Sequence, residues 1–175
     1  MILARITGVD PGLVDTGVVT MVFRPERRMF KVYAAAVRNS SKDQHNHAEA
    51  VAKTVEFQNR SMDRRLGPSP VFVEEYRPRQ KLQSDKQMLE LQAHLRTELP
   101  DATFLGNQGI KQLITSDLMK LFDVWTFPGQ PTHHQDLRSA ARIALLGAVR
   151  DSTTQDIINQ FVYSSLCEET PWEKY

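Results

Sequence analysis

The sequence predicts an α/β fold in which a mixed five-stranded sheet carries helices on both faces. Two observations lead to this prediction: three strand-like stretches follow one another at the start, and helical and strand-like segments alternate afterwards. No internal repeat or long linker divides the 175 residues, a length that suits one domain with a buried core. We expect residues 1–150 to form this domain and residues 151–175 to add a C-terminal helix and tail.

The first three strands are expected to form an antiparallel meander. Residues 3–9 are apolar and strand-favouring and end at Asp10-Pro11-Gly12, which is typical of a turn. The next two strands are expected at residues 16–23 and 29–37. The segment 24–28 between them is short enough to make a hairpin.

The remaining elements are read from their hydrophobic periodicity. Apolar residues at i, i+3, i+4 and i+7 indicate helices, and short apolar runs after breakers such as Gly67 and Pro68 indicate strands. The expected order is helix 44–66, strand 71–74, helix 84–99, strand 101–105, a short helical connection 110–122, helix 132–149 and helix 153–166. The final EETPWEKY is expected to be a tail.

The composition is that of a water-soluble globular protein. Hydrophobic residues make up 41% and charged residues 25%, and no run approaches the ~18 apolar residues of a membrane span. The N-terminus lacks the zones of a signal peptide, and a single cysteine, Cys167, excludes an internal disulfide framework, so we expect a cytoplasmic protein. Because 22 basic residues face 21 acidic ones, nucleic-acid binding would have to come from local clusters.

Three acids stand at the ends of expected elements. Asp10 follows the first strand, Glu74 ends the fourth, and Asp136 lies in the first turn of the helix at 132–149. If the first and fourth strands are parallel neighbours, their tips open at the same edge of the sheet, where α/β proteins place their ligands. Carboxylate oxygens there suit Mg²⁺ or Mn²⁺, and two such ions can assist phosphodiester cleavage. Taken singly, each acid also fits a turn residue, a solvated strand end or a favourable helix start.

Three motifs resemble those of the RuvC-type Holliday-junction resolvases, a branch of the ribonuclease H-like superfamily. They are GVDPGLVDTGVV at 8–19, VFVEE at 71–75 and DLRSAARIAL at 136–145, and the resemblance covers roughly residues 3–150. It implies a ribonuclease H-like fold, a homodimer, and paired nicking of four-way DNA junctions with two Mg²⁺ ions per site, replaceable by Mn²⁺. Asp10, Glu74 and Asp136 would be the catalytic metal ligands. The apolar surface for pairing could come from either of the first two long helices.

The last motif departs from the family pattern. The family's final helix carries a second acid, or a histidine with an acid, three residues apart. Here Ser139 lies three residues after Asp136, and His133 lies three residues before it. The small residues that follow favour the alignment in which Ser139 replaces the second acid, and His133 remains an alternative metal ligand.

Local groups near these motifs are candidates for contacting DNA. Cationic side chains could bind phosphate without reading sequence, and an aromatic ring beside them could stack on an unpaired base. These candidates are Tyr76, Arg77, Arg79, Lys81 and Lys111. The alternative is that the arginines are ordinary loop charges and that Tyr76 packs locally.

Other functions compete with this interpretation. Sugar-kinase and actin-like ATPases share an Asp and glycines at a strand-one hairpin, but they need a second glycine-rich loop, which this chain with eight glycines does not display. A ribonuclease H-like nuclease acting on RNA or other branched DNA is a closer alternative. A catalytically weakened junction-binding module is another, because Ser139 stands where an acid is usual. The compact chain is compatible with a virus-encoded resolvase acting in the host cytoplasm.

Overall fold

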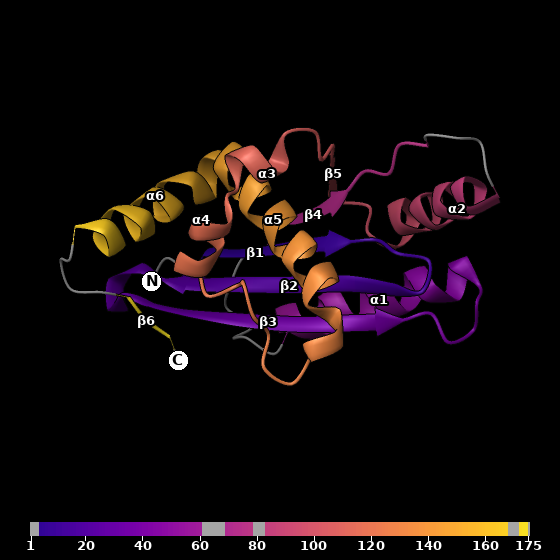
Figure 1. Cartoon of the computed structure of the whole chain (residues 1–175), viewed down its shortest axis with the longest axis horizontal. Helices are drawn as coiled ribbons and strands as arrows, with labels where there is room; N and C mark the ends of the chain where they lie inside the picture. Colours follow the sequence, from indigo (N-terminus) through magenta and orange to yellow (C-terminus); the bar gives the residue numbers. More distant parts are fainter. Residues whose placement is uncertain (1–3, 61–68, 79–82, 168–171, 175) are drawn as a thin grey trace.

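The computed structural model describes residues 4–60, 69–78, 83–167 and 172–174. Its centre is a mixed sheet with the strand order β5-β4-β1-β2-β3-β6 (Figure 1). The strands are β1 (Ala4–Asp10), β2 (Asp15–Arg24), β3 (Met29–Arg38), β4 (Val71–Glu74), β5 (Thr103–Leu105) and β6 (Glu173–Lys174). The first three form the expected antiparallel meander, while β4 runs parallel to β1 and β5 parallel to β4. The predicted α/β fold class is confirmed.

Helices cover both faces of the sheet, as the sequence predicts. They are α1 (Gln44–Arg60), α2 (Gln83–Glu98), α3 (Ile110–Leu113), α4 (Ser116–Leu121), α5 (His134–Arg150) and α6 (Ser152–Leu166). Successive side chains of a strand point to opposite faces. Val18 accordingly joins the core under α1 and α2, whereas Val19 joins the core under α5 and α6. Figure 1 shows α5 crossing one face of the sheet while α1 lies on the other.

Two glycines let α5 approach the sheet closely. A Cβ atom on Gly8 would lie 1.9 Å from the carbonyl oxygen of Ala140, and one on Gly17 would lie 2.4 Å from that of Asp136. Both distances are far below van der Waals contact, so no larger residue fits without moving the helix. The glycines therefore place the first turns of α5 directly over β1 and β2.

The C-terminal residues differ from the expected tail. Glu173 and Lys174 pair with Met29 and Phe30 as a sixth, parallel strand. Trp172 is only 8% exposed, and its indole nitrogen donates a hydrogen bond to Ser164 Oγ at 2.7 Å. This tryptophan packs against the rings of Phe23 and Phe161, which come from β2 and α6. The burial of an aromatic ring in a cluster of distant residues gives these last residues a fixed place.

Most element boundaries agree with the predicted ones within two residues. The helix predicted at 44–66 begins at Gln44, and its described part ends at Arg60, so positions 61–66 lie outside the described residues. The connection predicted at 110–122 consists of two short helices, α3 and α4. No helix of the described residues is long and apolar enough to cross a membrane.

Candidate functional site

The three predicted acids converge at one end of the sheet. The parallel pairing of β1 with β4 aligns Val9 with Val73, so the following residues, Asp10 and Glu74, leave the sheet side by side. Asp136 reaches the same place from the first turn of α5, over Gly17 of β2. The condition on which the sequence prediction depended, that strands one and four are parallel neighbours, is met.

Asp10 is in close electrostatic contact with both other acids. Its pKa is raised well above the ordinary value, chiefly by burial and next by the charge of Glu74 and a hydrogen bond with that side chain. The charge of Asp136 raises the pKa further, whereas a hydrogen bond with Ser139 lowers it. Negative charge is therefore crowded at this point, and a proton or a cation is needed to offset it.

Glu74 has a second neighbour that was not predicted from the sequence. The side-chain amide of Asn107, in the loop after β5, donates a hydrogen bond to Glu74 Oε1. Like Asp10 and Glu74, Asn107 lies just beyond the carboxyl end of a strand, which is the signal that could have identified it. Beside these groups is a cavity of about 170 Å³, lined by Glu74, Asn107, Ile110, Lys111, Ser139 and Arg142.

His133 is a further neighbour of Asp136. Its Nδ1 is 3.7 Å from Asp136 Oδ2 and 3.9 Å from Asp15 Oδ2. The other oxygen of Asp15, Oδ1, is buried and makes no hydrogen bond. Asp15 was not predicted as a site residue, although it lies within the first motif. The structure thus places both of the alternatives for the fourth position near the acids: Ser139 beside Asp10 and His133 beside Asp136.

The donor set fits a hard divalent cation. Asp10, Glu74 and Asp136 offer carboxylate oxygens, which Mg²⁺ and Mn²⁺ prefer, and the repulsion that raises the pKa of Asp10 is what a cation relieves. As the side chains lie, no three His, Cys, Asp or Glu residues among those described are close enough together to hold one ion.

One of the two histidines of α1, His47, supports the turn that follows Asp10, and it too was not predicted as part of the site. His47 is 2% exposed, and its Nε2 lies 2.9 Å from Thr16 Oγ1 and 3.1 Å from the carbonyl oxygen of Gly12. Burial lowers its pKa. Its position one turn before Val51, in the apolar stripe of the helix, is the sequence signal of this inward orientation.

The candidate DNA-binding residues do not form one group, and their surroundings differ. Tyr76 donates its hydroxyl hydrogen to Asp85, and its backbone N–H donates to Gln92 Oε1 at 2.6 Å, so this ring is fixed against α2. Arg77 is exposed, and Lys111 is exposed at the rim of the 170 Å³ cavity. Arg79 and Lys81 lie outside the described residues.

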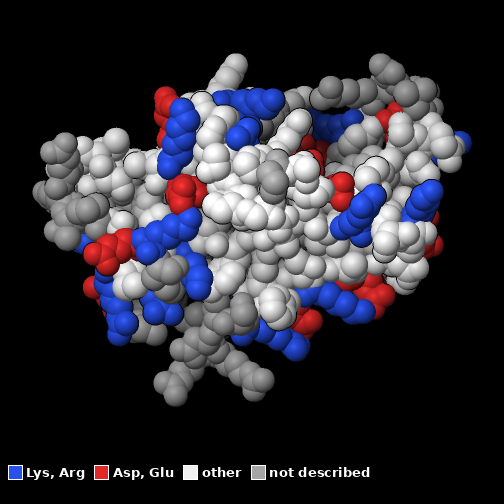
Figure 2. Space-filling view, turned by 60° about the horizontal axis from the view of Figure 1, so that its bottom comes forward, with Lys and Arg blue, Asp and Glu red and all other residues white. Residues whose placement is uncertain are grey.

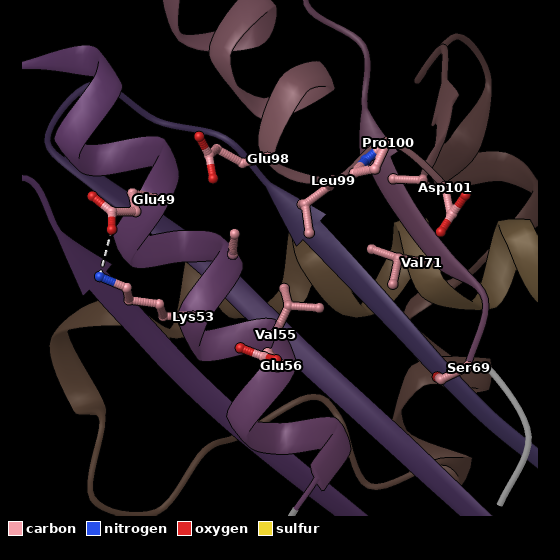
Figure 3. Close-up of a pocket in the computed structure, with 12 residues that line it drawn as sticks. Glu49, Lys53, Val55, Glu56, Ser69, Val71, Glu98, Leu99, Pro100 and Asp101 are labelled. Atoms are coloured by element: carbon pink, nitrogen blue, oxygen red, sulfur yellow. Dashed lines mark hydrogen bonds and ion pairs between the residues drawn. The ribbon is translucent and has the colours of Figure 1, made fainter.

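A larger cavity, of about 510 Å³, lies between α1 and the end of α2 (Figure 3). It borders Val71, at the amino end of β4, whereas Glu74 lies at the other end of that strand. Its charged lining is Glu49, Lys53, Glu56, Glu98 and Asp101, and Lys53 already pairs with Glu49 at 2.5 Å. This acidic lining would repel phosphate, so the cavity is no candidate for binding nucleic acid.

Charges of both signs are interspersed over the molecular face drawn in Figure 2, around a largely uncharged centre. This distribution agrees with the net charge of +1. A nucleic-acid contact on this face would therefore depend on small clusters of cations.

No protein-family model matches the chain, and no curated protein matches it in sequence. Its structure is similar to solved structures of RuvC from Thermus thermophilus. One, RuvC in complex with a Holliday junction substrate, superposes with a TM-score of 0.58 at 16% sequence identity, covering 86% of this chain and 97% of that one. Another RuvC structure from the same organism gives a TM-score of 0.54 at 15% identity, covering 94% and 96%. The chain therefore has the ribonuclease H-like α/β fold of the RuvC structures.

Proposed function

We propose that this protein is a metal-dependent endonuclease that resolves four-way DNA junctions. The observation that carries the proposal is the convergence of Asp10, Glu74 and Asp136 where β1 and β4 end and α5 begins. Support comes from the shared fold of the RuvC structures, one of which holds a Holliday junction. Fold alone does not specify a reaction, so the acids carry the functional argument.

In this proposal the three acids hold divalent metal, Mg²⁺ or Mn²⁺, with His133 as an additional ligand. When bound, two such ions supply activation of the attacking water and stabilisation of the leaving oxygen. Ser139 and Asn107 act through their hydrogen bonds, Ser139 on the Asp10 carboxylate and Asn107 on the Glu74 carboxylate. The parallel strands fix the separation of Asp10 and Glu74, and the glycine contacts fix α5 above them.

The substrate proposal includes contacts to the DNA backbone and a second copy of the chain. Lys111 is an exposed cation that lines the cavity beside Glu74, and Arg77 is an exposed cation that pairs with Glu75 at 3.7 Å; each could bind a phosphate. Paired cleavage of a symmetric junction needs two active sites that face opposed strands, so we propose that the working form is a homodimer.

One observation favours a second candidate, a module that binds junctions without cutting them. Besides Asp136, the group of α5 that interacts with Asp10 is Ser139 and not a second acid. A site with one carboxylate fewer binds its metal less tightly, and cleavage could disappear while DNA binding remains. A nuclease acting on RNA or on other branched DNA would use the same acids.

The test is cleavage of a synthetic four-way junction in Mg²⁺, beside a duplex of the same sequence and an RNA–DNA hybrid. We expect the junction to be cut with paired nicks and the other two substrates to be left intact. Asp10→Asn and Asp136→Asn should each reduce cleavage by more than about 100-fold, since even indirect neighbours of a metal matter by 10–100-fold. Junction binding should persist, because phosphate contacts supply most of the affinity.

Asp156→Asn is the matched control, because this acid is exposed on α6, away from the site. It should cut like the wild type. Preferential cutting of the hybrid would replace the junction proposal with the RNA alternative. Tight junction binding by the wild-type protein without any cleavage in Mg²⁺ or Mn²⁺ would replace it with the binding module.

A further inference from the structure

We infer that Arg138 and Arg142 of α5, together with Trp125, form a phosphate-binding site for the nucleic-acid strand that enters the candidate active site. The inference rests on the proposed function for its substrate. The residues themselves form a second cluster, on a different side of α5 from Asp136, and none belongs to the carboxylate group.

Arg138 is held over the indole ring of Trp125. Its guanidinium carbon lies 4.0 Å from the ring centroid, and its Nε donates a hydrogen bond to the carbonyl oxygen of Trp125 at 2.5 Å. A guanidinium stacked on an aromatic face loses little by partial burial, and its orientation is fixed. The stack therefore presents the remaining N–H groups of Arg138 in a defined direction.

Arg142 follows one helical turn later and is fixed in a similar way. Its Nε donates to the carbonyl oxygen of Ile114 at 3.3 Å, and its guanidinium carbon lies 6.0 Å from the centroid of the Trp125 ring. Lys120 approaches the same ring, with its Nζ 5.8 Å from the centroid. Three cations from α4 and α5 thus surround one tryptophan.

Among the described residues, the two arginines have no negatively charged partner. Within the part of the chain that the structure describes, neither makes an ion pair, and each uses Nε only on a neutral carbonyl. Burial, and next the charge of Arg138, lower the pKa of Arg142, so the two guanidinium groups repel each other. Arginine stays charged at any physiological pH, so this repulsion persists until an anion binds. Four N–H donors per arginine remain for that anion.

The position of Arg142 connects this cluster to the acids. Arg142 lines the 170 Å³ cavity together with Lys111, Ser139 and Glu74. Ser139 also contacts Asp10. A strand whose reacting phosphate lies at the carboxylates would therefore pass its neighbouring phosphates over Arg142 and then Arg138. Planar guanidinium groups match a phosphodiester, which can accept two parallel hydrogen bonds.

The experiment measures binding of a four-way junction in Ca²⁺ or EDTA, without cleavage, as a function of salt. Removing one cation that binds a phosphate lowers the slope of log K against log salt by about 1. We expect Arg138→Gln and Arg142→Gln each to lower the slope by about that amount and to weaken duplex binding as well. Arg142→Lys should restore the slope of the wild type, because it keeps the charge.

Arg150→Gln is the matched control, since this exposed arginine ends the same helix and its substitution removes the same charge. It should leave the slope unchanged. Thermal unfolding of every variant separates a folding defect from a binding defect. Unchanged slopes in both folded glutamine variants, with cleavage intact, would overturn this site and leave the proposed function standing. Reduced slopes in a protein that never cuts DNA would support this phosphate-binding site and overturn the proposed function. A wild-type protein that binds no nucleic acid would overturn both the site and the proposed function.

Discussion

At the scale of single residues, Asp10 is in an electrostatically unfavourable position. It ends a strand whose preceding residue, Val9, is fully buried, and its carboxylate shares its surroundings with Glu74 and Asp136. Binding sites commonly hold such unfavourable groups, because the interaction with the ligand offsets the cost that the free protein bears. The raised pKa of Asp10 expresses that cost.

This raised pKa predicts how stability changes with pH. Below the unfolded-state pKa of about 4, Asp10 is protonated in both states and costs nothing. As pH rises through the higher folded-state pKa, the carboxylate ionises among its neighbours and stability falls. In EDTA at pH 7, Asp10→Asn should therefore raise the melting temperature by about 2–4 °C, the effect of ~1 kcal/mol in a chain of this size.

Thermal unfolding of both proteins in EDTA between pH 3.5 and pH 8 measures this difference. The gap should close near pH 4, and Mg²⁺ should stabilise the wild type more than the variant. A gap that stays constant with pH would mean that Asp10 ionises freely in the folded protein.

At the scale of elements, the alternation along β4 separates its last residue, Glu74, from the acid that follows it, Glu75. Glu74 turns toward Asp10 and Asn107, whereas Glu75 pairs with Arg96 at 3.1 Å and with Arg77 at 3.7 Å. Exposed ion pairs contribute only ~0–1 kcal/mol, so Glu75 is not needed for the fold. The last residue of β4 thus faces the candidate site, and the residue after it forms ion pairs at the surface.

Glu74→Gln should therefore abolish junction cleavage, and Glu75→Gln should keep most of it. The two substitutions remove the same charge from adjacent positions, so each serves as the control for the other. Initial cleavage rates in Mg²⁺ at equal enzyme concentration decide between them. If Glu75→Gln is the inactive variant, the catalytic carboxylate is not the one that the strand directs toward Asp10.

Local sequence patterns were sufficient to predict most of the elements. Periodicity and breakers indicated the meander, the alternating helices and strands, and the edge at which the acids meet. The closeness of α5 to the sheet was not predictable, since Gly8 and Gly17 have the role of spacers only once α5 lies on them. The sixth strand depends on the burial of Trp172 in a cluster of residues that are distant in sequence. The position of the Arg138 side chain depends on the loop that carries Trp125.

At the scale of the whole molecule, apolar side chains remain exposed on the two helices that the sequence indicates for pairing. Phe57 of α1 is 73% exposed and Leu89 of α2 is 42% exposed, while Val55 is buried in the core. Exposed apolar side chains of this size mark contacts with another chain when they lie together on one face. We expect these two helices to contribute to the interface of the proposed dimer.

Light scattering at micromolar concentration should give twice the chain mass of 20.0 kDa, and Phe57→Asp should return it to the monomer value. Leu166→Asp provides the control, because Leu166 is 69% exposed but lies on α6. The Leu166→Asp variant should remain a dimer. A wild-type protein that is monomeric both alone and with junction DNA would exclude the pairing of two sites in one complex.

The close packing of α5 on β1 also determines when, during synthesis of the chain, the group of three acids is completed. Asp10 emerges early during synthesis, whereas Asp136 comes 126 positions later (136 − 10), which takes about 6–25 s at typical ribosomal rates. Until α5 docks, the first strand ends in a lone carboxylate with no partner from the helix. The carboxylate group of the proposed nuclease is therefore incomplete for most of the chain's synthesis, and under the proposed function the capacity to cut would arise together with the completed core.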